Sequence, residues 1–417
     1  MKCYVEVYGC TANKSDAHLV EGLISRHPQH ELVSTIEEAD LLIILTCTVI
    51  STTEQRMLHR IKTVLKSKKK LVIAGCMASV QKELLTDLFP EAILVTPRNI
   101  HLLFDIIEHK KSSELILQKA QVPKRYSSLI APVSIAEGCM FSCDYCITHL
   151  ARGTLCSYPE KDIITAVHDA IDQGCKEIQL TAQDTASYGF NGGSSLPLLV
   201  KKIIELKGNY MIRIGMMNPR TAKTIIQDLI PLFNHPQIYS FLHLPLQSGD
   251  NTILEKMNRG YTIQQGKEII NYSRIRIPEL TIATDVIVGY PTETDDQFQK
   301  TQHLLQEINP DVVNITRFSA RPFTKAKTMN GRIPTEIVKN RSRELTDLCK
   351  KLMIQRNKTY VGKNMVVLPL KKGKEQTTIC RSTNYKPVVI ENDVSLGEKV
   401  LVHIIEATDT HLVGMLK

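Results

Sequence analysis

Three apolar runs rich in β-branched residues occupy the N-terminal third of the chain, and each of them ends in a cysteine. The runs are KCYVEVYGC up to Cys10, LLIILTC up to Cys47 and KKLVIAGC up to Cys76. Between them lie patterns of helical period, at about residues 14–26, 52–67 and 79–89. Strands that alternate with helices in this way are typical of a parallel sheet covered on both faces. The sequence therefore predicts an N-terminal doubly wound parallel α/β domain.

The middle of the chain shows a longer alternation of the same kind. Helical patterns separate six strand-like runs, which is too few for a closed eight-stranded barrel. The sequence predicts a partial, open (β/α)6 barrel, with its chemistry at the carboxyl ends of the strands. The six runs lie at about residues 129–137, 175–182, 210–216, 238–244, 280–288 and 311–318.

The last 62 or so residues contain about five short strand-like runs, from NMVVLPL to HLVGML. A small antiparallel β-barrel of the oligonucleotide-binding type fits this pattern, although a purely structural cap is an alternative. The segment 110–128 is polar, lacks clear periodicity and contains Pro123, so we interpret it as a linker. The predicted domains are residues 1–112, 125–355 and 356–417.

Composition narrows the cellular context. No apolar stretch of about 18 residues is present, so we expect no membrane span. The N-terminus lacks the apolar region of a signal peptide, which favours a cytoplasmic protein. Thiols stay reduced in that compartment, so the 11 cysteines are unsuited to a disulfide framework. The net charge is +9, with the basic excess after residue 117, and this bias favours a polyanionic partner, with a solubilising surface charge as the alternative.

Cys10, Cys47 and Cys76 form the first candidate site. The carboxyl ends of parallel strands meet at one edge of a sheet, so these three thiols should converge. Soft thiolates select iron–sulfur clusters or zinc. Gly9 and Gly75 would allow the backbone to approach a bulky group. The alternative is that each cysteine is a small buried hydrophobic residue.

Cys139, Cys143 and Cys146 form the second candidate site, in EGCMFSCDYC with the spacing C-x3-C-x2-C. Three cysteines in one loop can hold three corners of a [4Fe–4S] cube and leave one iron open, which is typical of a reactive centre. A zinc-binding loop is the alternative. This motif after a strand resembles the radical S-adenosylmethionine (SAM) superfamily, and the resemblance implies that the open iron binds SAM and that these cysteines are catalytic.

Two further groups of residues complete the candidate site. Polar residues at predicted strand ends could bind SAM or substrate, although such residues also cap helices. After the last predicted strand, basic residues alternate with Phe318 and Phe323, a mixture typical of RNA binding, with a flexible basic loop as the alternative. The strand-end residues are Gln183, Asp184, Gln247 and Asp285, and the basic residues are Arg317, Arg321, Lys325 and Lys327.

Taken together, the motifs resemble the radical SAM methylthiotransferases over essentially the whole chain. YGCTANKSD, LTCTV and AGC resemble the cysteine motifs of their auxiliary cluster, and the three predicted domains resemble their N-terminal, radical SAM and TRAM domains. The resemblance implies two [4Fe–4S] clusters, one held by each cysteine trio. It also implies two molecules of SAM per reaction, one that methylates a sulfur on the auxiliary cluster and one that supplies a radical.

Within that family, LTCTV, RIGMMNP and RNKTYVGK look most like the archaeal and eukaryotic tRNA branch. The resemblance to this branch implies methylthiolation at C2 of N6-threonylcarbamoyladenosine 37, next to the anticodon. The implied partners are the anticodon stem-loop of tRNA, an electron donor and a sulfur source. Methylthiolation of isopentenyladenosine or of a ribosomal protein aspartate is an alternative within the family. A non-catalytic, zinc-stabilised RNA-binding protein is the alternative outside it.

Overall fold

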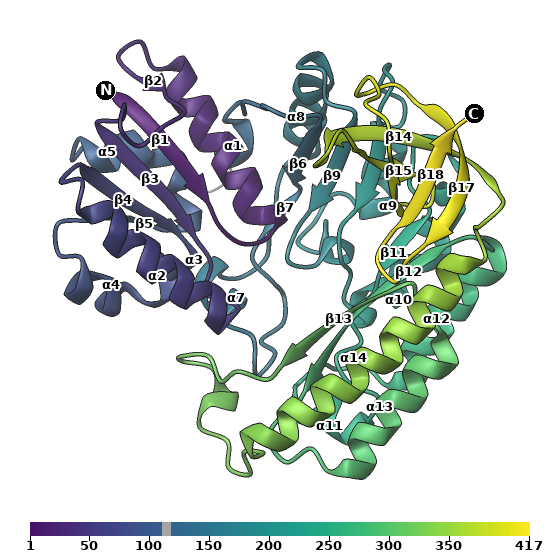
Figure 1. The fold of residues 1–417 in the computed structure, drawn as a ribbon. Helices are drawn as coiled ribbons and strands as arrows, with labels where there is room; N and C mark the ends of the chain where they lie inside the picture. Colours follow the sequence, from purple (N-terminus) through teal and green to yellow (C-terminus); the bar gives the residue numbers. More distant parts are fainter. Residues whose placement is uncertain (111–117) are drawn as a thin grey trace.

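The N-terminal part of the chain is a five-stranded parallel sheet with the order β2-β1-β3-β4-β5. The computed structural model describes residues 1–110 and 118–417 (Figure 1). The strands are β1 (Lys2–Val7), β2 (Glu31–Leu32), β3 (Leu41–Thr46), β4 (Lys70–Gly75) and β5 (Ile93–Val95). The helices are α1 (Thr11–Arg26), α2 (Ser51–Leu65), α3 (Cys76–Val80), α4 (Lys82–Leu88), η1 (Pro97–Leu102) and α5 (Leu103–Ile107).

Both faces of this sheet are covered, which confirms the doubly wound prediction. Helices α1, η1 and α5 pack on one face, whereas α2, α3 and α4 pack on the other. All six residues of the central strand β3 are buried, as its unbroken apolar run LLIILT predicts. Strands β2 and β5 were missed because two and three residues are too short to give a strand pattern.

The middle part contains six parallel strands in two three-stranded sheets, β6-β9-β10 and β11-β12-β13. A single parallel bridge between Ile212 and Ile238 links the two sheets, which confirms the predicted open arrangement of six strands. The strands are β6 (Ile130–Ser134), β9 (Glu177–Thr181), β10 (Met211–Ile214), β11 (Phe241–His243), β12 (Thr281–Val288) and β13 (Val312–Arg317).

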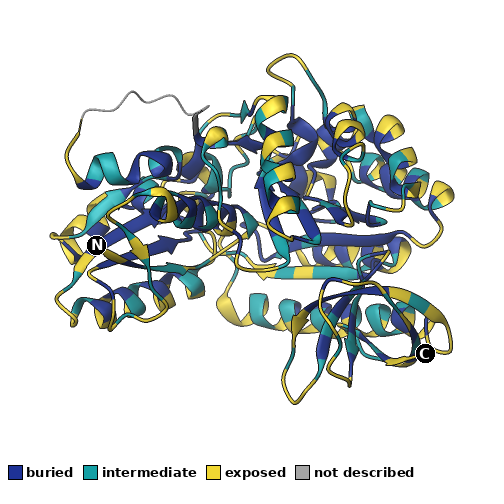
Figure 2. Ribbon diagram, turned by 90° about the horizontal axis from the view of Figure 1, so that it is seen from above, coloured by how far each residue is buried: buried dark blue, intermediate teal, exposed yellow. Residues whose placement is uncertain are grey.

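Helices cover the outside of these six strands, and all of the strands except β13 are largely buried, as Figure 2 shows. A long helix, α14, then runs along α13 to the C-terminal part. The helices are α8 (Glu160–Asp172), α9 (Leu196–Ile203), α10 (Pro219–Leu229), α11 (Asn251–Lys256), α12 (Ile263–Arg276), α13 (Asp295–Ile308) and α14 (Thr335–Lys358). A short hairpin of β7 (Ala136–Glu137) and β8 (Cys156–Ser157) frames a loop that contains α7 (Thr148–Arg152).

The C-terminal part is a closed five-stranded barrel with the order β14-β15-β16-β18-β17. Four of its five strand pairs are antiparallel, but β16 and β18 are parallel, so the barrel is not wholly antiparallel as predicted. A closed ring with an odd number of strands cannot alternate direction throughout, so one parallel pair is unavoidable. The strands are β14 (Asn364–Lys372), β15 (Thr378–Ser382), β16 (Pro387–Ile390), β17 (Val400–Ala407) and β18 (Leu412–Leu416).

This barrel covers the amino ends of the six parallel strands. Leu368 and Leu370 of β14 pack with Met211 and Phe241, which are the first residues of β10 and β11. The ammonium of Lys386 lies 2.8 Å from the buried carboxylate of Asp311, just before β13. The opposite, carboxyl end of the strands is therefore left to face the N-terminal part.

The predicted linker 110–128 is only partly a linker. Residues 111–117 lie outside the described part of the chain. Immediately after them, Gln118–Gln121 form the short helix α6, and Lys119 of this helix is 3% exposed. Among the described residues, no helix is long and apolar enough to cross a membrane.

Candidate active site

The structure brings Cys10, Cys47 and Cys76 together at the carboxyl ends of three adjacent strands. Cys10 caps the N-terminus of α1, three residues after β1, whereas Cys47 and Cys76 directly follow β3 and β4. Thr46 and Gly75 are paired in the sheet, so the two cysteines that follow them start from neighbouring positions. Cys47 and Cys76 are buried, and Cys10 is exposed.

Gly9 and Gly75 make this convergence possible. Their φ angles are +107° and +96°, a region that favours glycine. A Cβ on Gly75 would lie 2.6 Å from the carbonyl oxygen of Thr46, and one on Gly9 would lie 2.7 Å from the Cβ of Cys47. Any larger residue would push the strand ends and their cysteines apart.

The buried thiols of this trio, the auxiliary site, are chemically suited to a soft metal group. Burial is the main cause that raises the pKa of Cys76 to about 12, with the charge of Arg152 acting to lower it and the nearby thiols of Cys47 and Cys10 acting to raise it. Burial also raises the pKa of Cys47. Buried thiolates are costly without a cation, so a metal group that replaces the thiol protons would relieve this cost. The donor set therefore fits an iron–sulfur cluster with three protein ligands.

Arg152 connects this trio to the second one through a buried network of charged side chains. Its guanidinium donates to the side-chain oxygens of Asn13 and Asp16, both at 2.8 Å, and to Glu137 at 2.6 Å. Lys119 lies 2.7 Å from Asp16 and 2.5 Å from Glu137. All four charged side chains are 3% exposed or less, so the network holds the N-terminal sheet against the β7–α7 loop.

Asn13 holds the strand ends in place from within this network. Its side-chain nitrogen donates to the carbonyl oxygens of Tyr8 (2.7 Å) and Thr46 (2.8 Å). Its oxygen accepts from Arg152 and lies 3.9 Å from the sulfur of Cys76. Asn13 thus fixes the positions of two of the strand ends that carry the cysteines.

Cys139, Cys143 and Cys146 form the second trio, in the loop between β7 and α7. The amide of Cys139 donates to the carbonyl of Gly153 at 3.0 Å, and the amide of Cys146 donates to that of Cys143 at 2.9 Å. Burial raises the pKa of the Cys139 thiol to about 12 and also raises that of Cys143. The charges of Cys146 and Cys143 also raise the pKa of Cys139, and that of Cys146 raises the pKa of Cys143, as expected of neighbouring thiols. This donor set also fits a cluster with one open iron.

Arg259 places a positive charge beside this loop. One guanidinium nitrogen lies 3.4 Å from the sulfur of Cys143, and another donates to the carbonyl of Pro245 at 3.1 Å. Its charge also acts to lower the pKa values of Asp184 and Asp285. Burial acts in the opposite direction on both, and its effect is larger than that of Arg259 alone. Arg259 is 7% exposed and lies in a loop with no motif that could have singled it out.

The four predicted strand-end residues lie in this neighbourhood, but their visible contacts are within the protein. The side-chain oxygen of Gln183 accepts from the amide of Gly138 (2.7 Å), next to Cys139. Asp184 accepts from Thr221 (2.7 Å) and from two backbone amides, and burial raises its pKa to about 6. The contact of Gln183 therefore supports the cysteine loop, and those of Asp184 support the N-terminus of α10.

Gln247 and Asp285 are joined to each other. The backbone amide of Gln247, at φ +69°, donates to the carbonyl of Asp285 at 2.7 Å. The Asp285 carboxylate accepts from His243 (3.0 Å) and Asn314 (2.7 Å). Burial alone would raise the pKa of Asp285, but these two partners and the His243 charge outweigh burial and lower it. Asp285 thus remains a carboxylate at the mouth of the strands.

The structure places the predicted RNA-binding residues at and after the end of β13 in two different environments, some exposed and one buried. Arg317, Lys325 and Lys327 are exposed, as an RNA contact requires. Arg321 is only 6% exposed, and its guanidinium pairs with the carboxylate of Glu54 in α2. This pairing inside the protein argues against an RNA contact by Arg321, because its charge is already neutralised.

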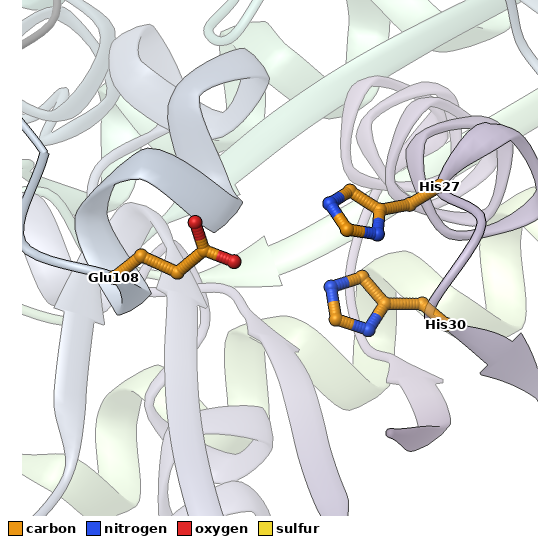
Figure 3. A group of neighbouring side chains, drawn as sticks. All are labelled: His27, His30 and Glu108. Carbon is orange, nitrogen blue, oxygen red and sulfur yellow. The ribbon is translucent and has the colours of Figure 1, made fainter.

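A third group of potential metal ligands lies apart from both cysteine trios. His27 and His30, after α1, and Glu108, after α5, have ligand atoms within 4.8 Å of one another, as Figure 3 shows. The two imidazole rings are stacked at 4.0 Å, with Phe104 against His30. The Glu108 carboxylate already pairs with Lys110 at 2.5 Å. Sequence reasoning missed this group because nothing in the pattern linked residues so far apart.

Three family descriptions match the chain. Uncharacterized protein family UPF0004 covers residues 2–96, the radical SAM superfamily covers residues 133–305, and the TRAM domain covers residues 358–417. Among solved structures, the radical SAM methyltransferase TsrM from Kitasatospora setae, with cobalamin and a [4Fe–4S] cluster bound, has a TM-score of 0.58 at 11% identity. The alignment covers 78% of this chain and 76% of that one. The fold and the cysteine loop thus define a radical SAM protein with a TRAM domain.

Proteins with similar sequences identify the family to which the chain belongs within this class. A probable threonylcarbamoyladenosine tRNA methylthiotransferase of Archaeoglobus fulgidus is 39% identical over 100% of this chain and 99% of its own. One of Methanocaldococcus jannaschii is 38% identical over 100% and 97%. The threonylcarbamoyladenosine tRNA methylthiotransferase of Drosophila melanogaster is 33% identical over 99% of this chain and 77% of its own. The chain belongs to the threonylcarbamoyladenosine tRNA methylthiotransferase family.

Proposed function

We propose that this protein transfers a methylthio group to C2 of N6-threonylcarbamoyladenosine at position 37 of tRNA. The observation that carries the proposal is the presence of two separate cysteine trios, one on each side of the junction between the N-terminal part and the six-stranded part. Arg152 joins them across this junction. A protein that only needed structural zinc would need a fourth ligand at each trio. Two incomplete ligand shells, close to the same junction, instead suit a reaction that needs two reactive metal groups. The names of the relatives support the nucleoside, and the basic exposed surface supports RNA.

We assign one [4Fe–4S] cluster to each trio. Cys139, Cys143 and Cys146 would hold the cluster that binds SAM, and Cys10, Cys47 and Cys76 would hold the auxiliary cluster. When bound, these groups would supply reductive cleavage of SAM to a 5′-deoxyadenosyl radical at the Cys139 trio and a site for the transferred sulfur at the Cys10 trio. An electron donor and a sulfur source must come from outside the chain. The proposed domains are residues 1–112, 125–355 and 356–417.

The protein's own side chains would position these groups. Gln183 holds the backbone next to Cys139 through Gly138. Arg259 supplies a fixed positive charge to the thiolate of Cys143. Asn13 and Arg152 would keep the Cys10 trio in a fixed position relative to the Cys139 trio. Exposed Lys325 and Lys327 would bind phosphates of the anticodon stem-loop, and exposed Arg317 would contact the RNA beside them.

Mass spectrometry of tRNA nucleosides from a strain that lacks the gene tests the activity. We expect loss of the 2-methylthio derivative of threonylcarbamoyladenosine, and its return when the wild-type gene is restored. Any 2-methylthio derivative of isopentenyladenosine in the same digest should not change. Persistence of the threonylcarbamoyl derivative would contradict the proposed activity.

Metal analysis tests the two-cluster assignment. Protein purified without oxygen should contain about eight iron atoms and eight sulfides per chain, from two cubane clusters. Cys139→Ala and Cys76→Ala should each reduce the iron content to about four. Stoichiometric zinc in place of iron would contradict radical chemistry and favour a structural role.

A further inference from the structure

A cavity of about 520 Å³ opens between the N-terminal part, the end of β13 and the start of α14. This volume lies in the range of sites for small molecules or single nucleosides. Its walls come mainly from three segments that are far apart in the sequence, residues 50–52, 315–320 and 332–339. The residues that matter here are Ile50, Thr52, Arg317, Phe318, Arg332 and Lys339.

The charged side chains that line the cavity all have the same sign. Arg317, Arg332 and Lys339 contribute three cations, and no acidic side chain among the described residues lines it. Lys339 is paired with the exposed Glu336 at 2.8 Å, and Arg332 donates to the carbonyl of Lys327 at 2.8 Å. Arg317 makes no ion pair with another described residue, so its guanidinium is available to a ligand. The cavity is therefore suited to an anionic group.

The cavity is linked to both cysteine trios through a few intervening residues. Ile50 and Thr52 follow Cys47 by three and five residues. On the other side, the ring of Phe318 lies 5.3 Å from that of Tyr290, which lies 6.5 Å from that of Tyr145, the residue before Cys146. A base that lies within reach of both trios would thus have this cavity next to it. The substituent of the base could then enter the cavity.

The wall between the cavity and the N-terminal part is held rigidly. Arg321 pairs with Glu54 in the first turn of α2 and donates to the hydroxyl of Thr48 at 3.2 Å. Gln81 donates to the same carboxylate at 3.0 Å. These buried contacts tie the segment after β13 to the segment after Cys47. The cavity is consequently formed before any ligand arrives, which lowers the entropic cost of binding.

We propose that this cavity binds the threonylcarbamoyl group of the substrate nucleoside, with Arg317 as the partner of its carboxylate. This inference rests on the proposed function and names the residues that determine its specificity. A guanidinium and a carboxylate form short, charge-assisted hydrogen bonds, in a paired geometry that a planar fork favours. The threonine hydroxyl and methyl would meet Thr52 and Ile50. An isopentenyl group would leave the three cations facing an apolar chain, so the same cavity disfavours that nucleoside.

Binding measurements on the full-length holoprotein separate this contact from general RNA affinity. Two fluorescent anticodon stem-loops would be used, one with threonylcarbamoyladenosine and one with its neutral threonine carboxamide. Wild-type protein should bind the carboxylate form about tenfold more tightly, which corresponds to one charge-assisted hydrogen-bonded pair. Arg317→Gln should remove this preference, and Arg317→Lys should keep part of it. If Arg332 takes over the carboxylate contact when Arg317 is replaced, the preference should be lost only in the double variant Arg317→Gln and Arg332→Gln.

Arg343→Gln is the matched control. Arg343 is an exposed cation on α14, one turn beyond Lys339, and does not line the cavity. Its loss should leave the ratio of the two affinities unchanged. Equal weakening of both stem-loops by Arg317→Gln would show that this arginine contacts a phosphate, and would overturn the proposal.

The two levels of inference can fail separately. If wild-type protein methylthiolates the stem-loop but binds the carboxylate and carboxamide forms equally, the assignment of the cavity is wrong and the proposed function stands. If the wild-type protein prefers the carboxylate form but transfers no methylthio group, the cavity assignment stands and the proposed function is wrong.

Discussion

Replacement of Arg152 by alanine should lower the free energy of unfolding by about 3–5 kcal/mol, the usual cost of breaking a buried ion pair. Its guanidinium lies 2.6 Å from Glu137 and 2.8 Å from Asp16, and all three side chains are 2% exposed. With charge centres about 4 Å apart and an effective dielectric constant of ~20, each pair contributes attraction on the order of 4 kcal/mol. Desolvation of the guanidinium offsets part of this sum. Alanine would leave two buried carboxylates that share only Lys119.

The size of this loss should depend on pH. In the native chain, burial acts to raise the pKa of Glu137, but the charges of Arg152 and Lys119 outweigh burial and lower it to about 2. The stability contributed by this carboxylate is thus present above its ordinary pKa of 4.5 and is lost as the pH falls toward 2. Without Arg152 the pKa of Glu137 rises, so its carboxyl is protonated at a higher pH than in the native chain. The deficit of the variant should therefore be larger at pH 7.5 than at pH 4.

Urea unfolding of the reduced, metal-free, full-length chain measures this deficit. The chain has no tryptophan, so far-UV circular dichroism is the suitable signal. Lys202→Ala is the matched control because Lys202 forms an exposed ion pair with Glu160, which contributes at most about 1 kcal/mol. A loss for Arg152→Ala no larger than that of the control would refute the argument. A deficit that grew on acidification would refute the pH reasoning.

Four further variants test the site. Cys139→Ala should abolish SAM cleavage to 5′-deoxyadenosine, whereas Cys47→Ala should preserve cleavage and lose methylthio transfer; identical behaviour of both would contradict the division of roles. Gly75→Ala places a Cβ 2.6 Å from a carbonyl oxygen at a φ of +96°. It should halve the iron content by loss of the auxiliary cluster, and eight iron atoms per chain would contradict this. Arg321→Ala should cost about 3–5 kcal/mol in urea unfolding because it leaves Glu54 buried and unpaired; weaker RNA binding without destabilisation would restore its predicted role as an RNA contact.

The pattern of apolar residues predicted the grouping of Cys10, Cys47 and Cys76, whereas the C-x3-C-x2-C spacing predicted that of Cys139, Cys143 and Cys146. Parallel strands place their carboxyl ends on one edge, so Cys10, Cys47 and Cys76 had to approach one another once the sheet was predicted. The same reasoning placed the loop of Cys139 at the mouth of the second set of strands. Strand periodicity fixes which end of a strand carries a residue, and that was the only geometric information the cysteine prediction required.

The roles of charged residues could not be predicted in the same way. Arg321 and Arg317 stand in one basic segment and look equivalent in the sequence, yet one is buried against Glu54 and the other lines a cavity. The difference depends on a partner 267 residues away. Arg152 depends likewise on Asp16, which is 136 residues away. Periodicity within a single element carries no information about such pairs.

These two buried arginines suggest how the reaction geometry is maintained. Arg152 ties the start of α1 to the β7–α7 loop, and Arg321 ties the start of α2 to the segment after β13. Both contacts cross the junction between the N-terminal part and the six-stranded part, and each begins close to a different cysteine of the auxiliary trio. Two separate anchors prevent rotation about either one, whereas a single anchor would leave a hinge. The two trios are thereby held at a fixed separation, as the proposed reaction, in which both act on one substrate, requires.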